Sequence, residues 1–295
     1  MRLYKISGED IREVQFVENE IVLRLFSGVG LFETTKILKG KPVFIREHLE
    51  RMINSAIRVW GKAPDFELLR SAAIKVSAGI ELGMLRIFLV EDNLNFTIFL
   101  STDDYPYSKS SDLTVKILEY QRNPNSFSSG LKPISYFDNV VLRERLKREN
   151  IDEGIFLSGD FVAEGTRSNI FWVKNGNVLT PPLSLGILGG ITRMKIFEIC
   201  KHFSLQLFEV RAKPQDVIEA DEVFITSSLL GVGQVRKIIY SGEEKILPSV
   251  PENSSLASTI KNELYKMELE DIGRLDDILK FSFEFRSEST KKSVR

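Results

Sequence analysis

The residues of this sequence that are best suited to carry out chemistry are a lysine and a glutamate among apolar neighbours. Lys132 lies in GLKPISY (130–136), and Glu164 lies in AEGTRSNI (163–170), a turn between expected apolar strands. A desolvated amine loses part of its proton affinity and becomes a competent nucleophile. A buried carboxylate needs a cationic partner, and a protonated ring nitrogen would serve. Taken singly, each residue is better interpreted as an exposed surface side chain.

Two further segments have the residue types that bind phosphate. In GILGGITR (186–193), two glycines and a threonine stand where a helix is expected to begin, so free backbone N–H groups and the helix dipole point at one spot. An ordinary glycine turn with Thr192 as the helix cap is the alternative, and for this segment alone it is favoured. Thr226, Ser227 and Ser228 follow an apolar strand, where hydroxyl groups bind phosphate or form turns about equally often.

The composition is that of a globular protein without a preference for polyanions. The 295 residues include 43% hydrophobic and 27% charged side chains, and the formal net charge is -1. A small molecule is therefore the expected partner, rather than nucleic acid or a membrane surface. The opening MRLYKISGEDIREVQF has scattered charges and forms neither a secretory signal nor a transmembrane helix, which favours a cytoplasmic protein.

Few residues are available for metal binding or for histidine catalysis. Cys200 is the only cysteine, which excludes an internal disulfide and a multi-cysteine metal site, and we expect it to pack in the core on a helix. His48 and His202 are the only histidines. We expect His48 to pack or to support other residues rather than to react, and His202 to be exposed. No metal site is expected.

Apolar spacing predicts alternating helices and strands along most of the chain. In the first part, short strands closed by turns precede a strand over 31–38, helices over 45–60 and 65–78, and strands over 85–91 and 95–101. In the second part, the expected helices are 136–149 and 192–203, and the expected strands are 113–118, 153–158, 168–174, 177–179, 205–210 and 222–226.

A polar stretch between these parts, DDYPYSKSSD (103–112), is the expected domain linker. We therefore expect a small N-terminal α/β domain over residues 1–105 and a larger domain over residues 106–270. Residues 271–295 end in FRSESTKKSVR, whose charge and lack of an apolar pattern predict a helix that frays into a partly disordered C-terminal extension.

Four motifs in sequence order resemble the fold-type IV pyridoxal-phosphate enzymes, which include branched-chain aminotransferases, D-amino acid aminotransferases and aminodeoxychorismate lyases. The resemblance runs from Gly28 to Arg236 through GVGLFETTKILKGKPVFIREHLERM, RNPNSFSSGLKPISYFDNVVLRERL, DEGIFLSGDFVAEGTRSNIFWVKNGNVLTPPLSLGILGGITR and ADEVFITSSLLGVGQVRKI. It implies a two-domain α+β or α/β fold, with a β-barrel-like core in the larger, cofactor-binding domain. It also implies bound pyridoxal 5'-phosphate and a homodimer with sites near the subunit interface.

The resemblance assigns catalytic roles to the lysine and the glutamate. Lys132 matches the family lysine that forms the internal Schiff base and later acts as general acid and base. Glu164 matches the carboxylate that keeps the pyridine nitrogen protonated, so that the ring can accept negative charge from the substrate carbon. Ser168 and Asn169, in the same motif, are assigned to the cofactor site. Tyr136 lies where branched-chain enzymes have a tyrosine near the phenolic oxygen, although other members have other residues there.

Four residues are assigned to the cofactor phosphate in the same way. Arg51 in EHLERM matches the phosphate-binding arginine of the family. Ile191 and Thr192 match the helix-start amides that contact the phosphate. Ser228 takes the position usually held by a threonine in the second phosphate cluster.

The substrate side is less well specified by the sequence. Arg86, on the expected strand 85–91, could bind a substrate carboxylate through its planar guanidinium, although a simple strand-face arginine is equally possible. Thr34 is a second candidate. The sequence also departs from the family pattern, because the common Gly-Asp-Gly turn is GVG (28–30) and Ser135 replaces a frequent asparagine. Neither change removes a group that the cofactor chemistry requires.

The choice of reaction depends on likeness within the family. GLFET (30–34) and RNPN (122–125) look more like the lyases than like the branched-chain enzymes. The preferred function is therefore conversion of 4-amino-4-deoxychorismate to 4-aminobenzoate and pyruvate for folate synthesis. An aminotransferase acting on branched-chain or D-amino acids is the alternative. A degenerate binding protein is disfavoured because Lys132 and Glu164 are both retained.

Overall fold

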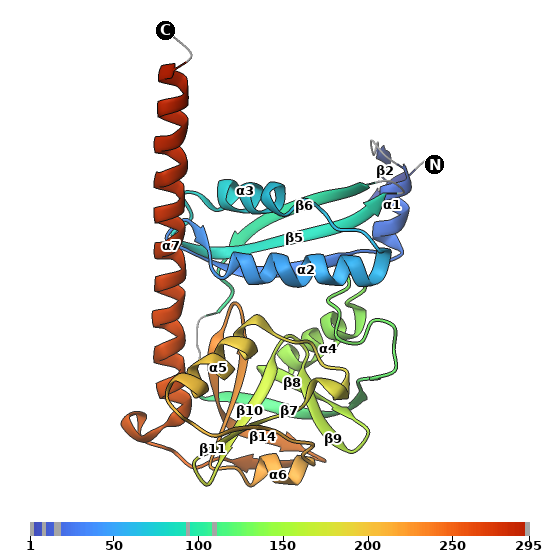
Figure 1. The fold of residues 1–295 in the computed structure, drawn as a ribbon. Helices are drawn as coiled ribbons and strands as arrows, with labels where there is room; N and C mark the ends of the chain where they lie inside the picture. The colour runs from blue at the N-terminus through green and yellow to red at the C-terminus, as the bar shows by residue number, and fades with distance from the viewer. Residues whose placement is uncertain (1–2, 8–9, 15–18, 93–94, 108–110, 293–295) are drawn as a thin grey trace.

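The computed structural model describes residues 3–7, 10–14, 19–92, 95–107 and 111–292, which fold into two parts with a long helix running alongside both (Figure 1). The architecture is a mixed α+β fold with curled sheets, as the sequence predicts. Within these residues, no helix combines the length and the apolar character needed to cross a membrane.

The N-terminal part is built on an antiparallel sheet with the order β4-β3-β5-β6. Its elements are β3 (Leu31–Leu38), β4 (Lys41–Pro42), β5 (Leu82–Asp92), β6 (Asn95–Asp104), α2 (Ile45–Trp60) and α3 (Phe66–Ser77). Because side chains alternate along a strand, Leu85 and Ile87 pack against the two helices while Thr34 and Arg86 face the other way. One face of this sheet is therefore core, and the other is free to form a site.

The predicted elements of this part are confirmed, with one addition. The expected strand 31–38 and helix 45–60 match β3 and α2, and helix α3 begins after Asp65, whose side chain accepts a hydrogen bond from Leu68 N at 2.8 Å. Before β3, the strands β1 (Leu3–Ser7) and β2 (Asp10–Val14) pair as expected, but they are followed by a helix, α1 (Asn19–Phe26). A short apolar run cannot distinguish helix from strand, so α1 was not predicted. Of the predicted turn Asp92-Asn93, Asn93 lies outside the described residues.

The larger part is a sheet with the order β12-β11-β10-β13-β14-β7-β8-β9, with β15 paired to β14. Its elements are β7 (Leu113–Gln121), α4 (Phe137–Arg148), β8 (Glu153–Ser158), β9 (Phe161–Gly165), β10 (Asn169–Lys174), β11 (Asn177–Thr180), η1 (Leu183–Leu185), α5 (Ile191–His202), β12 (Leu207–Glu209), α6 (Pro214–Ile218), β13 (Glu222–Ser227), β14 (Gly231–Tyr240), β15 (Glu243–Ile246) and η2 (Glu252–Ser254). Strand β9 also contacts β10, where Gly165 N donates to Ser168 O at 2.7 Å. The sheet therefore curls into a half-barrel, which confirms the barrel-like core.

Four elements of the larger part differ from the prediction. Glu164 lies on strand β9, where a turn was expected, because the charged residue interrupts the apolar pattern of a short strand. Strands β14 and β15 and helix α6 were not predicted. The expectations for Cys200 and His202 are confirmed: Cys200 is buried on α5, where burial raises the pKa of its thiol to about 11, and His202 is exposed.

The C-terminal helix α7 (Leu256–Lys292) corrects the prediction for the end of the chain. The helix starts well before residue 271 and continues to Lys292, where fraying into a partly disordered tail was expected. Lys36 on β3 donates to both carboxylate oxygens of Glu268 at 2.8 Å, so α7 is tied to the sheet of the N-terminal part. Ile260 and Leu264 of the same helix pack in the core of the larger part. The division of the chain into three regions stays a prediction.

Candidate active site

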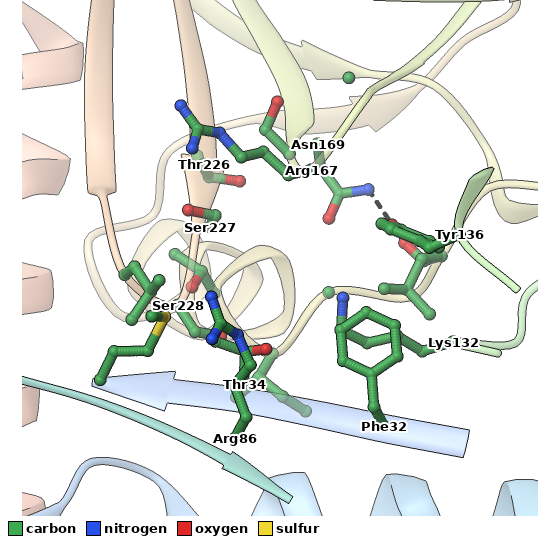
Figure 2. Close-up of a pocket in the computed structure, with 18 of the residues that line it drawn as sticks. Phe32, Thr34, Arg86, Lys132, Tyr136, Arg167, Asn169, Thr226, Ser227 and Ser228 are labelled. Atoms are coloured by element: carbon green, nitrogen blue, oxygen red, sulfur yellow. Dashed lines mark hydrogen bonds between the residues drawn. The ribbon is translucent and has the colours of Figure 1, made fainter. Parts of the chain in front are cut away.

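A cavity of about 400 Å³ lies where the free face of the β3–β5 sheet meets the larger part. All eleven site residues predicted from the sequence line it: Thr34, Arg51, Arg86, Lys132, Tyr136, Glu164, Ser168, Asn169, Ile191, Thr192 and Ser228. Figure 2 shows Lys132 beside Phe32, with Thr226 and Ser228 on another side of the same space. The fold thus brings together residues from four separate motifs, whose individual roles remain predictions.

The segment that carries Lys132 is held against β3 by backbone hydrogen bonds. Phe32 N donates to Lys132 O at 2.9 Å, and Ile134 N donates to Gly30 O at 2.9 Å. A Cβ atom on Gly30 would lie 2.3 Å from Ile134 Cδ1 and 2.9 Å from Leu89 O. Only glycine therefore permits this close approach, which fixes where the lysine enters the cavity.

The amine of Lys132 lies against aromatic rings. Its Nζ is 4.1 Å from the ring centre of Phe32 and 4.9 Å from that of Tyr136, and these two rings meet edge to face at 5.2 Å. Burial lowers the pKa of Lys132 to about 8, with Arg51 adding to this effect and Glu33 opposing it. An amine with this pKa is partly unprotonated near neutral pH, as a nucleophile must be.

Glu164 is buried and held by one hydrogen bond and one ion pair from other segments. Leu188 N donates to its Oε2 at 2.9 Å, and Arg122 Nε lies 3.0 Å from its Oε1. Burial raises the pKa of Glu164, and Arg122 partly offsets this. A carboxylate of raised basicity is suited to share a proton with a ring nitrogen. Arg122, whose guanidinium lies 4.1 Å from the Phe156 ring, was not assigned a role from the sequence.

The start of α5 and the end of β13 form an anion cradle. Gly190, rather than Thr192, is the N-cap of α5, so the first N–H groups of the helix are free to bind a ligand. A Cβ atom on Gly190 would lie 2.2 Å from Asn169 Oδ1, so glycine is required here. Among the described residues, the Oγ1 atom of Thr226 is buried without a hydrogen-bond partner. A buried unsatisfied hydroxyl beside free amides fits a bound phosphate.

Glu33 links the residues on both sides of this cradle. Arg51 donates from Nε to Glu33 Oε1 at 2.8 Å and from Nη2 to Oε2 at 2.6 Å, and its Nη1 donates to Gly189 O at 2.8 Å. His48 Nδ1 lies 2.7 Å from Glu33 Oε2, and its Nε2 lies 3.1 Å from Ser228 Oγ. Burial alone would raise the pKa of Glu33, but Arg51 and His48 lower it to about 2.

The Glu33 network explains the role of His48. The side chain is buried, does not line the cavity and connects Glu33 to Ser228, which does line it, so His48 packs and supports other residues as expected. Burial lowers the pKa of His48, which favours the neutral imidazole. Glu33 itself was missed because its function depends on partners that α2 and β13 bring together only in the fold.

Three predicted residues have partners that bear on their roles. Arg86 pairs with Asp103 at 2.7 Å, and Thr34 lies opposite Arg86 in the β3–β5 register. Ser168 Oγ donates to the buried Glu153 at 2.9 Å, so its proton is used within the protein. Arg86 is therefore a partly neutralised, half-buried cation, and Ser168 supports the wall of the cavity.

Comparison with known proteins agrees with this geometry. A model of the amino-transferase class IV family matches residues 30–238. The chain is 29% identical over 288 residues to aminodeoxychorismate lyase of Bacillus subtilis, which covers 90% of this chain and 94% of the relative. It is 27% identical over 229 residues to D-alanine aminotransferase of Listeria innocua, covering 72% and 78%.

A hypothetical aminotransferase from Mycobacterium tuberculosis, in its PLP-bound form, has the same fold, with a TM-score of 0.76 at 20% identity over 88% of this chain and 97% of the other. The lysine, the buried carboxylate and the anion cradle fit the aldehyde, the ring nitrogen and the phosphate of that cofactor. The chain belongs to the amino-transferase class IV family, and its cofactor is pyridoxal phosphate.

Proposed function

We propose that the protein is a lyase that converts 4-amino-4-deoxychorismate to 4-aminobenzoate and pyruvate, a step in folate synthesis. The observation that carries the proposal is the amine of Lys132, whose pKa is lowered to about 8 in the same cavity as the buried Glu164. The Bacillus subtilis lyase aligns with 90% of the chain and the Listeria innocua aminotransferase with 72%, which supports elimination over amino transfer. A cytoplasmic location remains a prediction of the sequence.

Different residues of the cavity would bind different parts of the cofactor. Lys132 would hold the cofactor at its aldehyde carbon, Glu164 would face the ring nitrogen, and Arg51 with the cradle would hold the phosphate. When bound, pyridoxal phosphate supplies a conjugated ring that accepts an electron pair from the substrate. With substrate bound, the Nζ atom of Lys132 would remove a substrate proton and deliver one to the departing pyruvate.

One comparison of activities tests the proposal. The holoenzyme is incubated with 4-amino-4-deoxychorismate, and release of 4-aminobenzoate and pyruvate is compared with keto-acid formation from a panel of D- and L-amino acids. Release of both products at a rate above that of any amino transfer supports the lyase. Keto acids without 4-aminobenzoate would favour the aminotransferase, and a protein without visible cofactor absorbance would favour a binding role.

The residues around Arg51 lead to a prediction with two measurable parts. Arg51→Ala is expected to weaken cofactor binding roughly 10- to 150-fold, because a charge-assisted contact to phosphate contributes about 1.5 to 3 kcal/mol. It also leaves the buried Glu33 without its arginine, so the free energy of unfolding of the cofactor-free protein should fall by about 3 kcal/mol. Equilibrium dialysis and denaturant unfolding measure the two effects.

Arg46→Ala is the matched control, since Arg46 lies on the same helix and its exposed side chain pairs only with Glu50 among the described residues. This control should bind cofactor like the wild type. Wild-type cofactor affinity in Arg51→Ala would remove Arg51 from the phosphate site.

We also propose that the protein is a homodimer. Large apolar side chains are exposed on the described surface, with Phe26 at 68%, Phe127 at 71% and Phe137 at 74%. Phe137 directly follows the cavity residue Tyr136, so a partner that covered it would lie next to the site. The molar mass in solution, measured by light scattering, tests the proposal, and a monomer at micromolar concentration would contradict it.

A further inference from the structure

Two arginines of the cavity have no role in cofactor binding. Arg143 lies on α4, two turns after Tyr136, and Arg167 follows β9, and both line the cavity that contains Lys132. Arg143 has no ion pair among the described residues, and its Nε atom is buried without a hydrogen-bond acceptor. Burial and the nearby charge of Arg167 both lower the pKa of Arg143. Two like charges that line one cavity repel each other, and an anion bound between them would relieve this repulsion.

The buried acid that acts on both arginines, Glu153, is already occupied by other donors. Glu153 accepts hydrogen bonds from Gly154 N at 3.0 Å, from Thr166 N at 3.0 Å and from Ser168 Oγ at 2.9 Å, and Thr166 Oγ1 donates to it as well. Arg167 Nε is 3.9 Å from Glu153 Oε2, too far for a hydrogen bond. Glu153 therefore offsets only part of the two positive charges and accepts no hydrogen bond from either guanidinium among the described residues.

Arg86, which lines the same cavity, differs from these two arginines because it has an ion-pair partner. Its Nη1 lies 2.7 Å from Asp103 Oδ2, so its charge is offset within the protein. Arg143 and Arg167, by contrast, stand at the junction with a second cavity of about 550 Å³, and Tyr107 lines both cavities beside them. The Arg167 guanidinium lies 4.8 Å from the ring centre of Tyr107, which holds it at this junction. The junction has both space and positive charge for a second part of a substrate.

We infer that Arg143 and Arg167 bind a carboxylate of the substrate at the junction of the two cavities, and that the protein thereby selects amino compounds with two carboxylates. The inference rests on the proposed function, since 4-amino-4-deoxychorismate carries two carboxylates and one leaves with each product. A guanidinium offers paired N–H donors that match a carboxylate, so the contact discriminates against substrates that lack this group. The residue predicted from the sequence for this task was Arg86, which the structure pairs with Asp103.

A binding measurement on the holoenzyme tests the inference without turnover. Benzene-1,3-dicarboxylate and benzoate serve as unreactive probes, titrated by calorimetry. The dicarboxylate should bind at least about 10-fold more tightly than benzoate. Arg143→Gln and Arg167→Gln should each reduce this ratio toward one and raise the KM for 4-amino-4-deoxychorismate, with the visible spectrum of the cofactor unchanged.

The controls separate this inference from the proposed function. Arg145→Gln changes an exposed arginine of the same helix and should keep the wild-type ratio. Arg167 is itself exposed, so Arg167→Gln should fold even if Arg143→Gln does not. Equal affinity for the two probes in the wild type, or a ratio unchanged in Arg167→Gln, would overturn the inference whatever reaction the enzyme catalyses. Absence of lyase activity together with an arginine-dependent ratio would overturn the proposed function alone.

Discussion

Lys132→Ala is expected to abolish both the borohydride-reducible visible absorbance of the holoenzyme and its turnover. Lys132 is the only lysine that lines the cavity among the described residues, so no other amine can attach the cofactor there. Loss of the acid–base group alone should lower the rate by at least roughly a hundredfold. Absorbance before and after borohydride, with steady-state rates at saturating cofactor, measures both effects.

A second measurement makes this prediction specific to one residue. After borohydride reduction of the wild-type protein, peptide mass spectrometry should find the cofactor on Lys132. Lys75→Ala, which removes an exposed lysine of α3, should leave absorbance and rate unchanged. Reduced cofactor attached to any other lysine would contradict the assignment.

Glu164→Gln is expected to keep the colour of the bound cofactor and to lose most of the turnover. The amide can still accept the hydrogen bond from Leu188 N, but it cannot hold a ring nitrogen protonated, so the ring accepts electrons less readily. We expect the rate to fall at least roughly tenfold, since even one pKa unit of altered proton affinity corresponds to about 1.4 kcal/mol. Turnover of the cofactor-saturated variant is the deciding measurement.

The change also leaves Arg122 without its buried carboxylate, so stability must be measured beside activity. Glu144→Gln, at an exposed position on α4, is the control for loss of one negative charge. Wild-type turnover of folded, cofactor-saturated Glu164→Gln would show that Glu164 does not act on the ring nitrogen.

The elements that the sequence predicted well have strong periodic patterns. Helix α2 and strand β3 were predicted with the bounds that the structure has, because the apolar residues repeat at helical spacing in one and end at a glycine turn in the other. Strand β9 was missed because five residues with a buried glutamate have no apolar alternation. The start of α7 was misplaced because its apolar positions lie before residue 271, whereas the segment after that residue is charged and has no apolar pattern.

For the site, the motifs predicted which residues line the cavity, but only the fold shows which residues are their partners. Motif order was sufficient to find the residues that line the cavity, including Lys132 and Glu164. It could not identify Glu33, Arg122 or Arg143, since each depends on partners distant in sequence or, for Arg143, on the absence of one among the described residues. Charge balance around a cavity is a property of three-dimensional structure, so no reading of spacing alone can reveal it.

The contact between α7 and the N-terminal sheet limits how the enzyme can move. Strand β3 contributes Phe32 and Thr34 to the cavity wall, and its Lys36 is held by the buried Glu268 of a helix that packs on the larger part. Rotation of the two parts away from each other would separate this buried ion pair, and the separation of buried charges costs free energy. The ion pair therefore acts as a brace that holds the two walls of the active site at a fixed spacing.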